Sequence, residues 1–396
     1  MRQYKDSGIE WIGKIPETWE YKRFKYSGVF EKGKLPDSSN IERIGLPIIG
    51  ASEMLGKDAR TYTSDTTVPK CSVDDILILW DGANAGITAS GLNGVVSSTA
   101  VKYTCIDKSI FPKYVAYLLK YGENYFKEKV NGTTIPHMNM VYINDIPLLC
   151  PPFSVQQHIA DYLDSKCGEI DSLIALQEQM IESLKAYKQS VITEAVTKGL
   201  NPNAKLVPSG IDWIGEIPEG WEVCRIKDLA TMKSGSNLTS EQIANEGSYP
   251  VYGGNGLRGY YEDYSNEGDY VLVGRQGALC GNINYASGRF WATDHAVVCY
   301  PRREFSLTWF GETLRSMNLG QYSLSAAQPG LSVDRIREIK MPLPPLSEQR
   351  LIASYLDSKC ADIDRLIALK QLKIEALKDY KKSVIYEAVT GKTIIE

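Results

Sequence analysis

The sequence predicts an α+β fold in which two mixed α/β domains, related by pseudo-twofold symmetry, are joined by two long antiparallel coiled-coil helices. Three observations support this prediction. A unit of about 200 residues occurs twice, two long segments carry an apolar stripe at helical spacing, and the stretches between them hold short β-type runs broken by glycine, asparagine and proline. The chain has 396 residues, which exceeds the usual size of a single domain.

Two parts of the repeated unit are nearly unchanged between its copies. Segment 7–20 recurs at 209–222, an offset of 202 residues, and both copies hold the pattern Trp-Ile-Gly-x-Ile-Pro-x-x-Trp. Segment 151–197 recurs at 344–390, an offset of 193 residues, with about two thirds of its positions identical. The cores between these parts diverge. Two equal frames with dissimilar cores suggest that one assembly recognises two different things, and neutral drift after duplication is the alternative.

Segment 155–197 and its copy predict two long helices. The first contains no proline, and Gly199 and Gly391 follow the two copies as terminators. One apolar stripe cannot be buried by its own helix, so we expect the copies to pack on each other antiparallel as a rigid spacer. An ordinary long core helix is the alternative. The predicted helix–helix seam comprises Ile170, Leu173, Ile174, Ile181, Leu184, Tyr187, Val191, Ile363, Leu366, Ile367, Ile374, Leu377, Tyr380 and Val384.

Charged positions outside the stripe also repeat between the two helical segments. A purely solvated face would tolerate drift, so this repetition suggests two equivalent partner-binding surfaces. Charge pairing within each helix explains the same pattern equally well. The repeated residues are Glu182, Lys185, Lys188 and Glu194 in the first copy and Glu375, Lys378, Lys381 and Glu387 in the second.

The two divergent cores read as mixed, mainly antiparallel domains with long loops. Strands are expected at 75–80 and 95–103 in the first core and at 270–273 and 296–300 in the second. Helices are expected at 112–130 and 306–318. Loops on such a scaffold are where recognition residues usually lie.

Amides, hydroxyls and arginines in these loops are candidates for DNA contacts. Arginine can read guanine bidentately, asparagine can read adenine, and serine or threonine can bond to bases or phosphates. Each residue also has an ordinary structural role as its alternative. The candidates are Lys34, Asn84, Ser97, Ser98, Thr133 and His137 in the first core and Asn255, Arg258, Arg275 and Arg289 in the second.

Sequence motifs give no support for catalysis or for a metal site in this chain. The match to a dinucleotide fingerprint at 254–259 is followed by turn and strand chemistry instead of a helix. The Pro-Pro pairs at 151–152 and 344–345 precede helices, where proline commonly marks a boundary. The three histidines do not repeat between the halves, and none belongs to a known catalytic motif.

The cysteines, the apolar runs and the net charge indicate the cellular compartment and the kinds of partner to expect. The eight cysteines form no C-x-x-C pair and read as reduced thiols, which favours a cytoplasmic protein. No apolar run is long enough to span a bilayer, and the N-terminus has no signal-peptide pattern, so we expect no membrane association. The net charge of −4 differs from the basic excess of simple DNA binders. A basic groove offset by acidic outer faces would reconcile the two, so the charge leaves DNA binding open.

The repeated motifs resemble those of type I restriction–modification specificity subunits. The resemblance rests on Trp-Ile-Gly-x-Ile-Pro-x-x-Trp at 11–19 and 213–221, and on the two segments that run from Pro-Pro-x-x-x-Gln through Tyr-Leu-Asp to Glu-Ala-Val-Thr. It covers nearly the whole chain. Each motif alone is weak, and their duplicated order is specific.

This resemblance implies four regions and a set of partners. Residues 1–150 and 201–343 would be target recognition domains, each for one half of a bipartite, asymmetric DNA site. Residues 151–200 and 344–396 would be helical regions that set the spacing and dock two modification subunits. Those subunits would carry S-adenosylmethionine chemistry, and restriction subunits would use ATP and Mg²⁺, leaving this chain without a cofactor. A duplicated coiled-coil adaptor without DNA readout and a stand-alone DNA-modifying enzyme are the alternatives.

Overall fold

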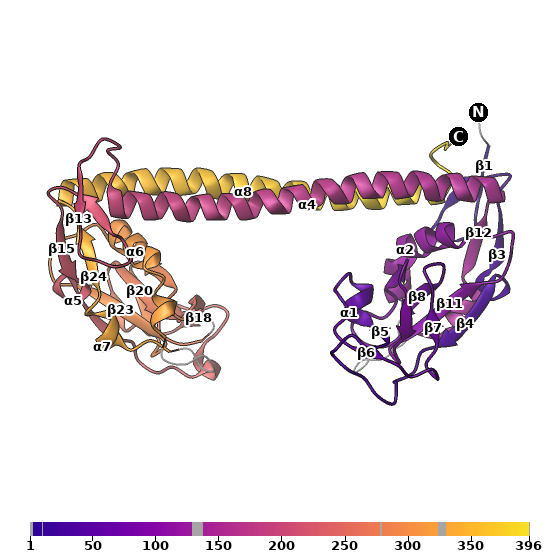
Figure 1. Cartoon of the computed structure of the whole chain (residues 1–396), viewed down its shortest axis with the longest axis horizontal. Helices are drawn as coiled ribbons and strands as arrows, with labels where there is room; N and C mark the ends of the chain where they lie inside the picture. Colours follow the sequence, from indigo (N-terminus) through magenta and orange to yellow (C-terminus); the bar gives the residue numbers. More distant parts are fainter. Residues whose placement is uncertain (1–2, 10, 129–137, 278, 324–329, 396) are drawn as a thin grey trace. The chain divides into compact units, whose positions relative to one another are not determined.

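The computed structural model describes residues 3–9, 11–128, 138–277, 279–323 and 330–395. The chain divides into two compact units: unit 1 comprises Met1–Gln177 with Leu372–Glu396, and unit 2 comprises Glu178–Gln371. Each unit contains one mixed α/β domain and one segment from each of two long helices, α4 (Phe153–Lys198) and α8 (Leu346–Val389) (Figure 1). We call the described residues of 3–150 domain 1 and those of 201–343 domain 2.

Domain 1 contains two four-stranded sheets and two pairs of short strands. The first sheet has the order β4-β11-β8-β9 with every pair antiparallel, and the second has the order β6-β5-β10-β7, in which β5 and β10 are parallel. Strand β1 pairs with β2, and β3 with β12. The elements are β1 (Tyr4–Asp6), β2 (Lys14–Pro16), β3 (Glu20–Arg23), η1 (Phe24–Tyr26), β4 (Gly28–Lys32), β5 (Leu46–Ile49), α1 (Ala51–Met54), β6 (Tyr62–Thr63), β7 (Lys70–Cys71), β8 (Ile76–Leu79), β9 (Thr88–Ser90), β10 (Gly94–Val96), β11 (Ala100–Cys105), α2 (Pro112–Glu128), α3 (Met140–Asp145) and β12 (Pro147–Cys150).

Domain 2 repeats this topology strand for strand. Its sheets have the orders β16-β23-β20-β21 and β18-β17-β22-β19, again with one parallel pair, β17 with β22. The prediction of mixed, mainly antiparallel domains is therefore confirmed. The elements are β13 (Leu206–Pro208), β14 (Glu216–Pro218), β15 (Glu222–Arg225), α5 (Ile226–Leu229), β16 (Ala230–Ser234), η2 (Ser240–Gln242), β17 (Tyr249–Gly253), β18 (Gly256–Tyr261), β19 (Asn266–Glu267), β20 (Tyr270–Gly274), β21 (Ile283–Ala286), β22 (Arg289–Ala292), β23 (Ala296–Pro301), α6 (Leu307–Ser316), η3 (Leu319–Tyr322), α7 (Val333–Ile336) and β24 (Lys340–Leu343).

The hydrophobic core of each domain lies between its sheets and one amphipathic helix. In domain 1, β8 is buried at all four positions, and α2 turns Tyr114 and Leu118 inward. In domain 2, α6 does the same with Trp309 and Phe310. Helices α2 and α6 lie within the ranges expected at 112–130 and 306–318, because apolar residues spaced three and four apart give one face to bury.

The repeated Trp-Ile-Gly-x-Ile-Pro-x-x-Trp motif packs against the C-terminal end of a long helix in each unit. In unit 1 the buried Trp19 lies against Gly391, which follows α8, and in unit 2 Trp221 lies against Gly199, which follows α4. Both glycines have positive φ, +71° and +72°, as helix-terminating glycines commonly do. A Cβ on Gly391 would come within 2.8 Å of the Trp19 ring, so this closing contact also requires glycine.

Each unit pairs the start of one long helix with the end of the other, which makes the pairing antiparallel. In unit 1 the core includes Leu163 of α4 and Ile385 of α8, and in unit 2 it includes Ile192 of α4 and Ile352 of α8. The same ion pair occurs once in each unit. Lys381 Nζ lies 2.7 Å from Asp171 Oδ2 in unit 1, and the equivalent Lys188 Nζ lies 2.7 Å from Asp364 Oδ1 in unit 2.

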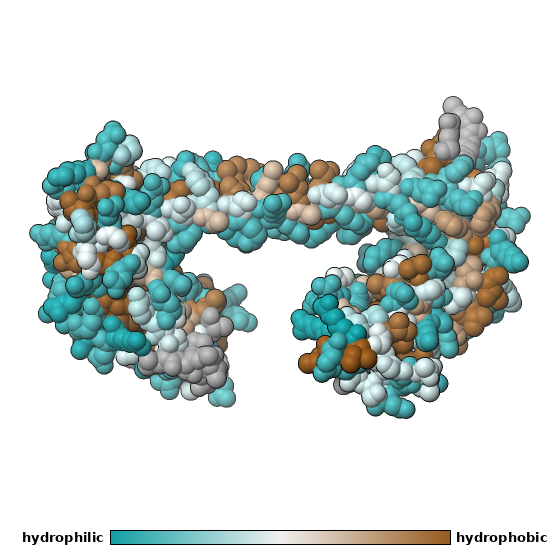
Figure 2. All heavy atoms as spheres, viewed as in Figure 1, coloured by the Kyte–Doolittle hydropathy of each residue, from teal (hydrophilic) through white to brown (hydrophobic). Residues whose placement is uncertain are grey.

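The predicted seam residues fall into three groups of exposure. Four of them, Leu173, Tyr187, Leu366 and Tyr380, are 44% to 57% exposed, so their placement in a buried seam is wrong. Figure 2 shows hydrophobic side chains at the surface of both helices. The half-buried positions are Ile174, Leu184, Ile367 and Leu377. The buried positions are Ile170, Ile181, Val191, Ile363, Ile374 and Val384.

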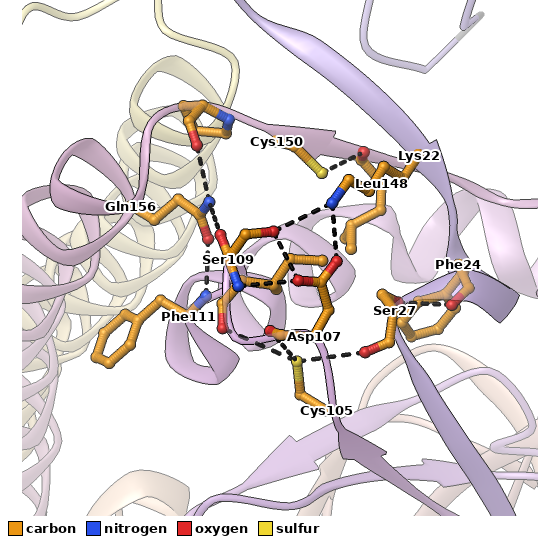
Figure 3. A network of polar contacts seen from close by, with 12 residues as sticks. Lys22, Phe24, Ser27, Cys105, Asp107, Ser109, Phe111, Leu148, Cys150 and Gln156 are labelled. Carbon is orange, nitrogen blue, oxygen red and sulfur yellow. Dashed lines mark hydrogen bonds and ion pairs between the residues drawn. The ribbon is translucent and has the colours of Figure 1, made fainter.

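A buried glutamine at the start of each long helix joins that helix to its domain. Gln156 is 1% exposed; its Nε2 donates to the carbonyls of Ser109 (3.0 Å) and Pro151 (2.8 Å), and its Oε1 accepts from the amide of Phe111 (2.8 Å). Figure 3 shows this network beside the ion pair between Lys22 and Asp107. The hydrogen bond from the Lys22 ammonium holds the pKa of Asp107 at about 2, so the carboxylate is charged at neutral pH.

Gln349 makes the equivalent joint in unit 2. Its Nε2 donates to the carbonyl of Pro344 at 2.9 Å, and its Oε1 accepts from the amide of Ser306, the N-cap of α6, at 3.1 Å. The glutamine of the repeated Pro-Pro-x-x-x-Gln motif therefore has the same structural task in both copies. It satisfies main-chain groups just before α2 in unit 1 and α6 in unit 2, at the start of a long helix.

Candidate nucleic-acid interface

Three main-chain hydrogen bonds, which we call the frame, join strand ends in domain 1. The amide of Trp80 donates to the carbonyl of Thr99 at 2.8 Å, and the amide of Met138 donates to the carbonyl of Trp80 at 2.9 Å. The amide of Gly33 donates to Ala100 at 3.0 Å. These bonds connect the ends of β4, β8 and β11 with the segment before α3. Side chains at these strand ends are free to face outward because the main-chain groups are already satisfied.

Domain 2 builds the same frame from equivalent residues. The amide of Arg275 donates to the carbonyl of His295 at 2.9 Å, and the amide of Leu331 donates to Arg275 at 2.9 Å. The amide of Gly235 donates to Ala296 at 3.0 Å. Every bond has its counterpart in domain 1, although the side chains at the frame differ.

The outer hairpin of each domain also keeps one register. Pro47 pairs with Tyr62 across β5 and β6, and Pro250 pairs with Tyr260 across β17 and β18. An arginine stands two residues before each tyrosine, Arg60 in domain 1 and Arg258 in domain 2, on or beside an edge strand. Both are exposed, and neither forms an ion pair with a described residue. The hairpins thus present one unpaired guanidinium each at an equivalent position.

Arg60 belongs to a group of cations around a surface hollow of about 590 Å³. The lining includes the cations Arg43, Lys57 and Arg60 and the carboxylate of Asp58. None of the three cations forms an ion pair with a described residue. Arg43 adopts a φ of 62°, one of two non-glycine residues with positive φ in the described chain. Sequence reasoning missed these residues because the loop between β5 and β6 is longer than its counterpart, which hides the equivalence of Arg60 with Arg258.

The candidate residues of domain 1 lie mostly near the frame. Lys34 is exposed, and its amide donates to Val96 at 3.2 Å. Ser97 and Ser98 are half-buried in the turn before β11, where Ser97 Oγ lies 2.9 Å from Thr99 Oγ1. Asn84 is half-buried in the turn between β8 and β9. Thr133 and His137 lie outside the described residues.

The candidate residues of domain 2 divide into free and engaged arginines. Arg289 is engaged: its Nε lies 3.2 Å from Glu267 Oε1 and its guanidinium carbon 4.8 Å from the centre of the Tyr264 ring. Within the described ranges, the side chains of Arg258 and Arg275 form hydrogen bonds to serine hydroxyls alone, at 3.3 Å each. Asn255 is exposed at the tip of the β17–β18 hairpin and accepts from Asn282 at 3.1 Å.

Three kinds of catalytic or cofactor site were compared with the described residues: a reactive cysteine, a metal centre and a dinucleotide-binding turn. Burial raises the pKa of all eight cysteine thiols, to about 12 for Cys299, so none is primed as a thiolate nucleophile. The described residues contain no group of His, Cys, Asp and Glu side chains able to hold a metal ion. The glycines at 254–259 belong to the β17–β18 hairpin, so they form no dinucleotide-binding turn.

No helix in the described ranges is both long and apolar enough to cross a bilayer. The helices α4 and α8 are long enough but not apolar enough, because charged residues occur on every turn or two of their surfaces.

Comparison with solved structures gives the fold. A chain from a structure concerned with complex assembly and conformational transition of the type I R-M system matches with a TM-score of 0.72 at 15% identity, covering 96% of this chain and 99% of that one. The HsdS subunit of Thermoanaerobacter tengcongensis matches with a TM-score of 0.51 at 15% identity, covering 98% of this chain and 100% of that one.

Sequence comparison reaches the same group of proteins. The chain is 28% identical over 426 residues to the type I restriction enzyme MjaVIII specificity subunit of Methanocaldococcus jannaschii, covering 99% of this chain and 97% of that one. It is 40% identical over 134 residues to the EcoprrI specificity subunit of Escherichia coli, 33% of each chain. The model of the type I restriction modification DNA specificity domain matches residues 16–186 and 218–379. The chain therefore belongs to the type I restriction modification DNA specificity family.

Proposed function

We propose that this chain is the specificity subunit of a type I restriction–modification complex and that each domain contacts one half of a bipartite, asymmetric DNA site. The observation that carries the proposal is the repetition of one backbone frame in two domains whose exposed polar side chains differ. The equivalent main-chain bonds give both domains the same local backbone, and their different side chains contact different bases. The chain supplies recognition and leaves catalysis to its partners.

The partners follow from the same proposal. Two modification subunits dock on the paired segments of α4 and α8, one for each unit, and bring the S-adenosylmethionine chemistry. Restriction subunits join this assembly and use ATP and Mg²⁺. The long helices set the gap between the half-sites. The exposed apolar residues repeated on both helices support the docking sites, since such groups mark interaction surfaces.

A selection from random DNA tests the proposal. The chain is purified with its modification subunit, incubated with a pool of random duplexes, and the bound duplexes are sequenced. We expect two short, dissimilar sequence blocks separated by a fixed gap. Binding without sequence preference would reject the proposal and favour a duplicated adaptor. Methylation of DNA by the chain alone with S-adenosylmethionine would reject it in favour of a stand-alone enzyme.

The two matched arginines give a prediction about salt dependence. Arg60→Ala and Arg258→Ala each remove one exposed guanidinium, so each should weaken binding to all sequences about equally and reduce the salt slope of log K by about 1. Fluorescence anisotropy between low and high salt measures both quantities. Arg289→Lys keeps the charge of an arginine already paired with Glu267 and serves as the control. An unchanged slope in both alanine variants would remove these residues from the DNA-contacting surface.

A further inference from the structure

The matched frames identify four pairs of equivalent positions whose chemistry differs. Equivalence comes from strand register and from the shared main-chain bonds, so it does not depend on sequence similarity. Two of the positions directly follow β8 in domain 1 and β20 in domain 2. One is the last residue of β4 or β16, and one directly precedes β11 or β23. The pairs are Lys32 with Ser234, Trp80 with Arg275, Asp81 with Gln276, and Thr99 with His295.

In domain 1 the four positions form a neutral, partly aromatic set. Lys32 Nζ lies 2.8 Å from Asp81 Oδ2, and the same ammonium is 5.4 Å from the centre of the Trp80 ring. The positive charge of Lys32 is therefore matched by Asp81, and Trp80 is half-buried between the two strand ends. This set holds a carboxylate and an ammonium that pair with each other, together with an apolar ring.

In domain 2 the same positions carry a net positive set with an amide. Arg275 Nη1 donates to Ser234 Oγ at 3.3 Å, and Gln276 is exposed beside it. Both residues line a surface hollow of about 690 Å³ together with Ser234 and Asp334. His295 is half-buried and directly precedes β23. This set offers a planar guanidinium, an amide and an imidazole in place of the ion pair and the indole.

The frame does not need these particular side chains to fold. The bonds that hold it are main-chain bonds at 2.8 to 3.0 Å in both domains, formed equally well by tryptophan or arginine and by threonine or histidine. None of the eight residues is buried: four are exposed and four are half-buried. The backbone conformation is therefore kept while its side chains change from acid to amide and from indole to guanidinium. This is expected of recognition residues carried on a fixed scaffold.

We propose that these four matched positions determine which bases each domain prefers, an inference that rests on the proposed DNA-binding function. Gln276 and Asp81 give the sharpest consequence. Glutamine pairs bidentately with the N6 and N7 groups of adenine, whereas a carboxylate accepts from the N4 amino group of cytosine. The equivalent position therefore reads adenine in the half-site of domain 2 and cytosine in that of domain 1.

Nearly isosteric exchanges test this assignment. The assembled complex with modification subunits is prepared with Gln276→Glu or Asp81→Asn, and the random-duplex selection is repeated. Gln276→Glu should move one position of the domain 2 half-site from adenine toward cytosine by at least about fivefold, and Asp81→Asn should move one position of the other half-site in the reverse direction by a similar factor. The remaining half-site should be unchanged in each case.

A matched control separates base reading from a general effect of charge. Arg302→Ala lowers the net charge by one, as Gln276→Glu does. Arg302 directly follows β23, about 20 Å from His295 along the strand. This variant should leave both half-sites unchanged. Thermal unfolding of all variants verifies that each is folded. A second variant transfers the whole set from domain 1 by combining Ser234→Lys, Arg275→Trp, Gln276→Asp and His295→Thr, and it should shift the domain 2 half-site toward the preferences of domain 1.

The outcomes distinguish failure of the proposed function from failure of the assigned base contacts. Absence of sequence preference in the unmodified complex overturns the proposed function and this inference together. A selective unmodified complex whose base preferences survive both single exchanges overturns only the inference. Uniform loss of affinity with unchanged preferences also overturns it, because the residues would then be general contacts. A shift in the half-site of the other domain contradicts the assignment in the same way.

Discussion

Replacing Gln156 with leucine should destabilise unit 1 by about 3 kcal/mol. The substitution removes three hydrogen bonds and leaves the amide of Phe111 and the carbonyls of Ser109 and Pro151 without their partner at a largely buried joint. Removing one member of a buried hydrogen-bonded group costs the desolvation of the groups that remain, which is about 1–3 kcal/mol for each when water cannot reach it. For a unit of this size, the melting temperature should fall by roughly 6–12 °C.

Hydrogen exchange locates this effect. The amide of Phe111 should lose protection in Gln156→Leu, while the amide of Ser306 in unit 2 keeps it. Gln349→Leu should show the converse pattern with a smaller cost of about 2 kcal/mol, because Gln349 makes two such bonds instead of three.

Gln157→Leu is the control for helix propensity and side-chain size. Gln157 follows Gln156 on α4 but is exposed, so its replacement should change the free energy of unfolding by no more than about 0.5 kcal/mol. If Gln156→Leu unfolds at the same denaturant concentration as this control, the buried glutamine is not what fixes domain 1 to α4.

Charged residues on the exposed apolar face of unit 2 should remove one of the two modification subunits. The triple variant Tyr187→Lys, Leu366→Lys and Leu369→Lys places charge on three exposed apolar positions, and at least a hundredfold loss of affinity for that subunit is expected, on the order of the effect of losing two or three interface anchors. Native mass spectrometry should then show one modification subunit for each chain. The equivalent variant in unit 1, with lysine at 173, 176 and 380, should give the same stoichiometry, and the combination should leave no modification subunit bound.

Helical geometry explains why these residues point away from the domains. Tyr187 precedes Val196 by nine residues, and Cys360 precedes Leu369 by the same spacing. Nine residues correspond to about two and a half turns, so the members of each pair lie on opposite faces of their helix. Val196 and Cys360 pack into the core of unit 2, which leaves Tyr187 and Leu369 facing outward.

Glu182→Gln with Glu375→Gln provides the control for this experiment. Both residues are exposed and repeated, and their ion pairs with described residues lie within their own helices, with Lys185 and Lys378. Assembly should persist in this variant. Retention of both modification subunits in the triple lysine variant would show that they dock elsewhere. Loss of both from that single-unit variant would show that the two docking sites are not independent.

Much of the fold was predictable from the sequence because its determinants are local or repeated. Heptad-like spacing predicted the two long helices, and Gly199 and Gly391 marked their ends. Amphipathic periodicity predicted α2 and α6. The duplication predicted two domains of one kind, and the structure repeats even their single parallel strand pair.

The seam between the helices was only partly predictable. A stripe of apolar residues shows that a helix has an apolar surface, but not how many partners share it. Leu173 and Tyr187 follow the same spacing as Ile170 and Val191, yet the first two are exposed and the last two are buried. Which part of a wide stripe is covered depends on the angle between neighbouring helices and on the domain beneath them, and neither is written in the spacing.

By itself, the sequence determined that one unit is built twice, where the long helices lie and which motifs belong to their family, since repetition and periodicity are properties of the chain order. The tertiary structure alone decided that Gln156 and Gln349 are joints, that Arg60 matches Arg258, and that Trp80 and Asp81 stand where Arg275 and Gln276 stand in the second domain. These equivalences arise from strand register and main-chain hydrogen bonds, which persist through insertions and substitutions that erase the likeness of the sequences.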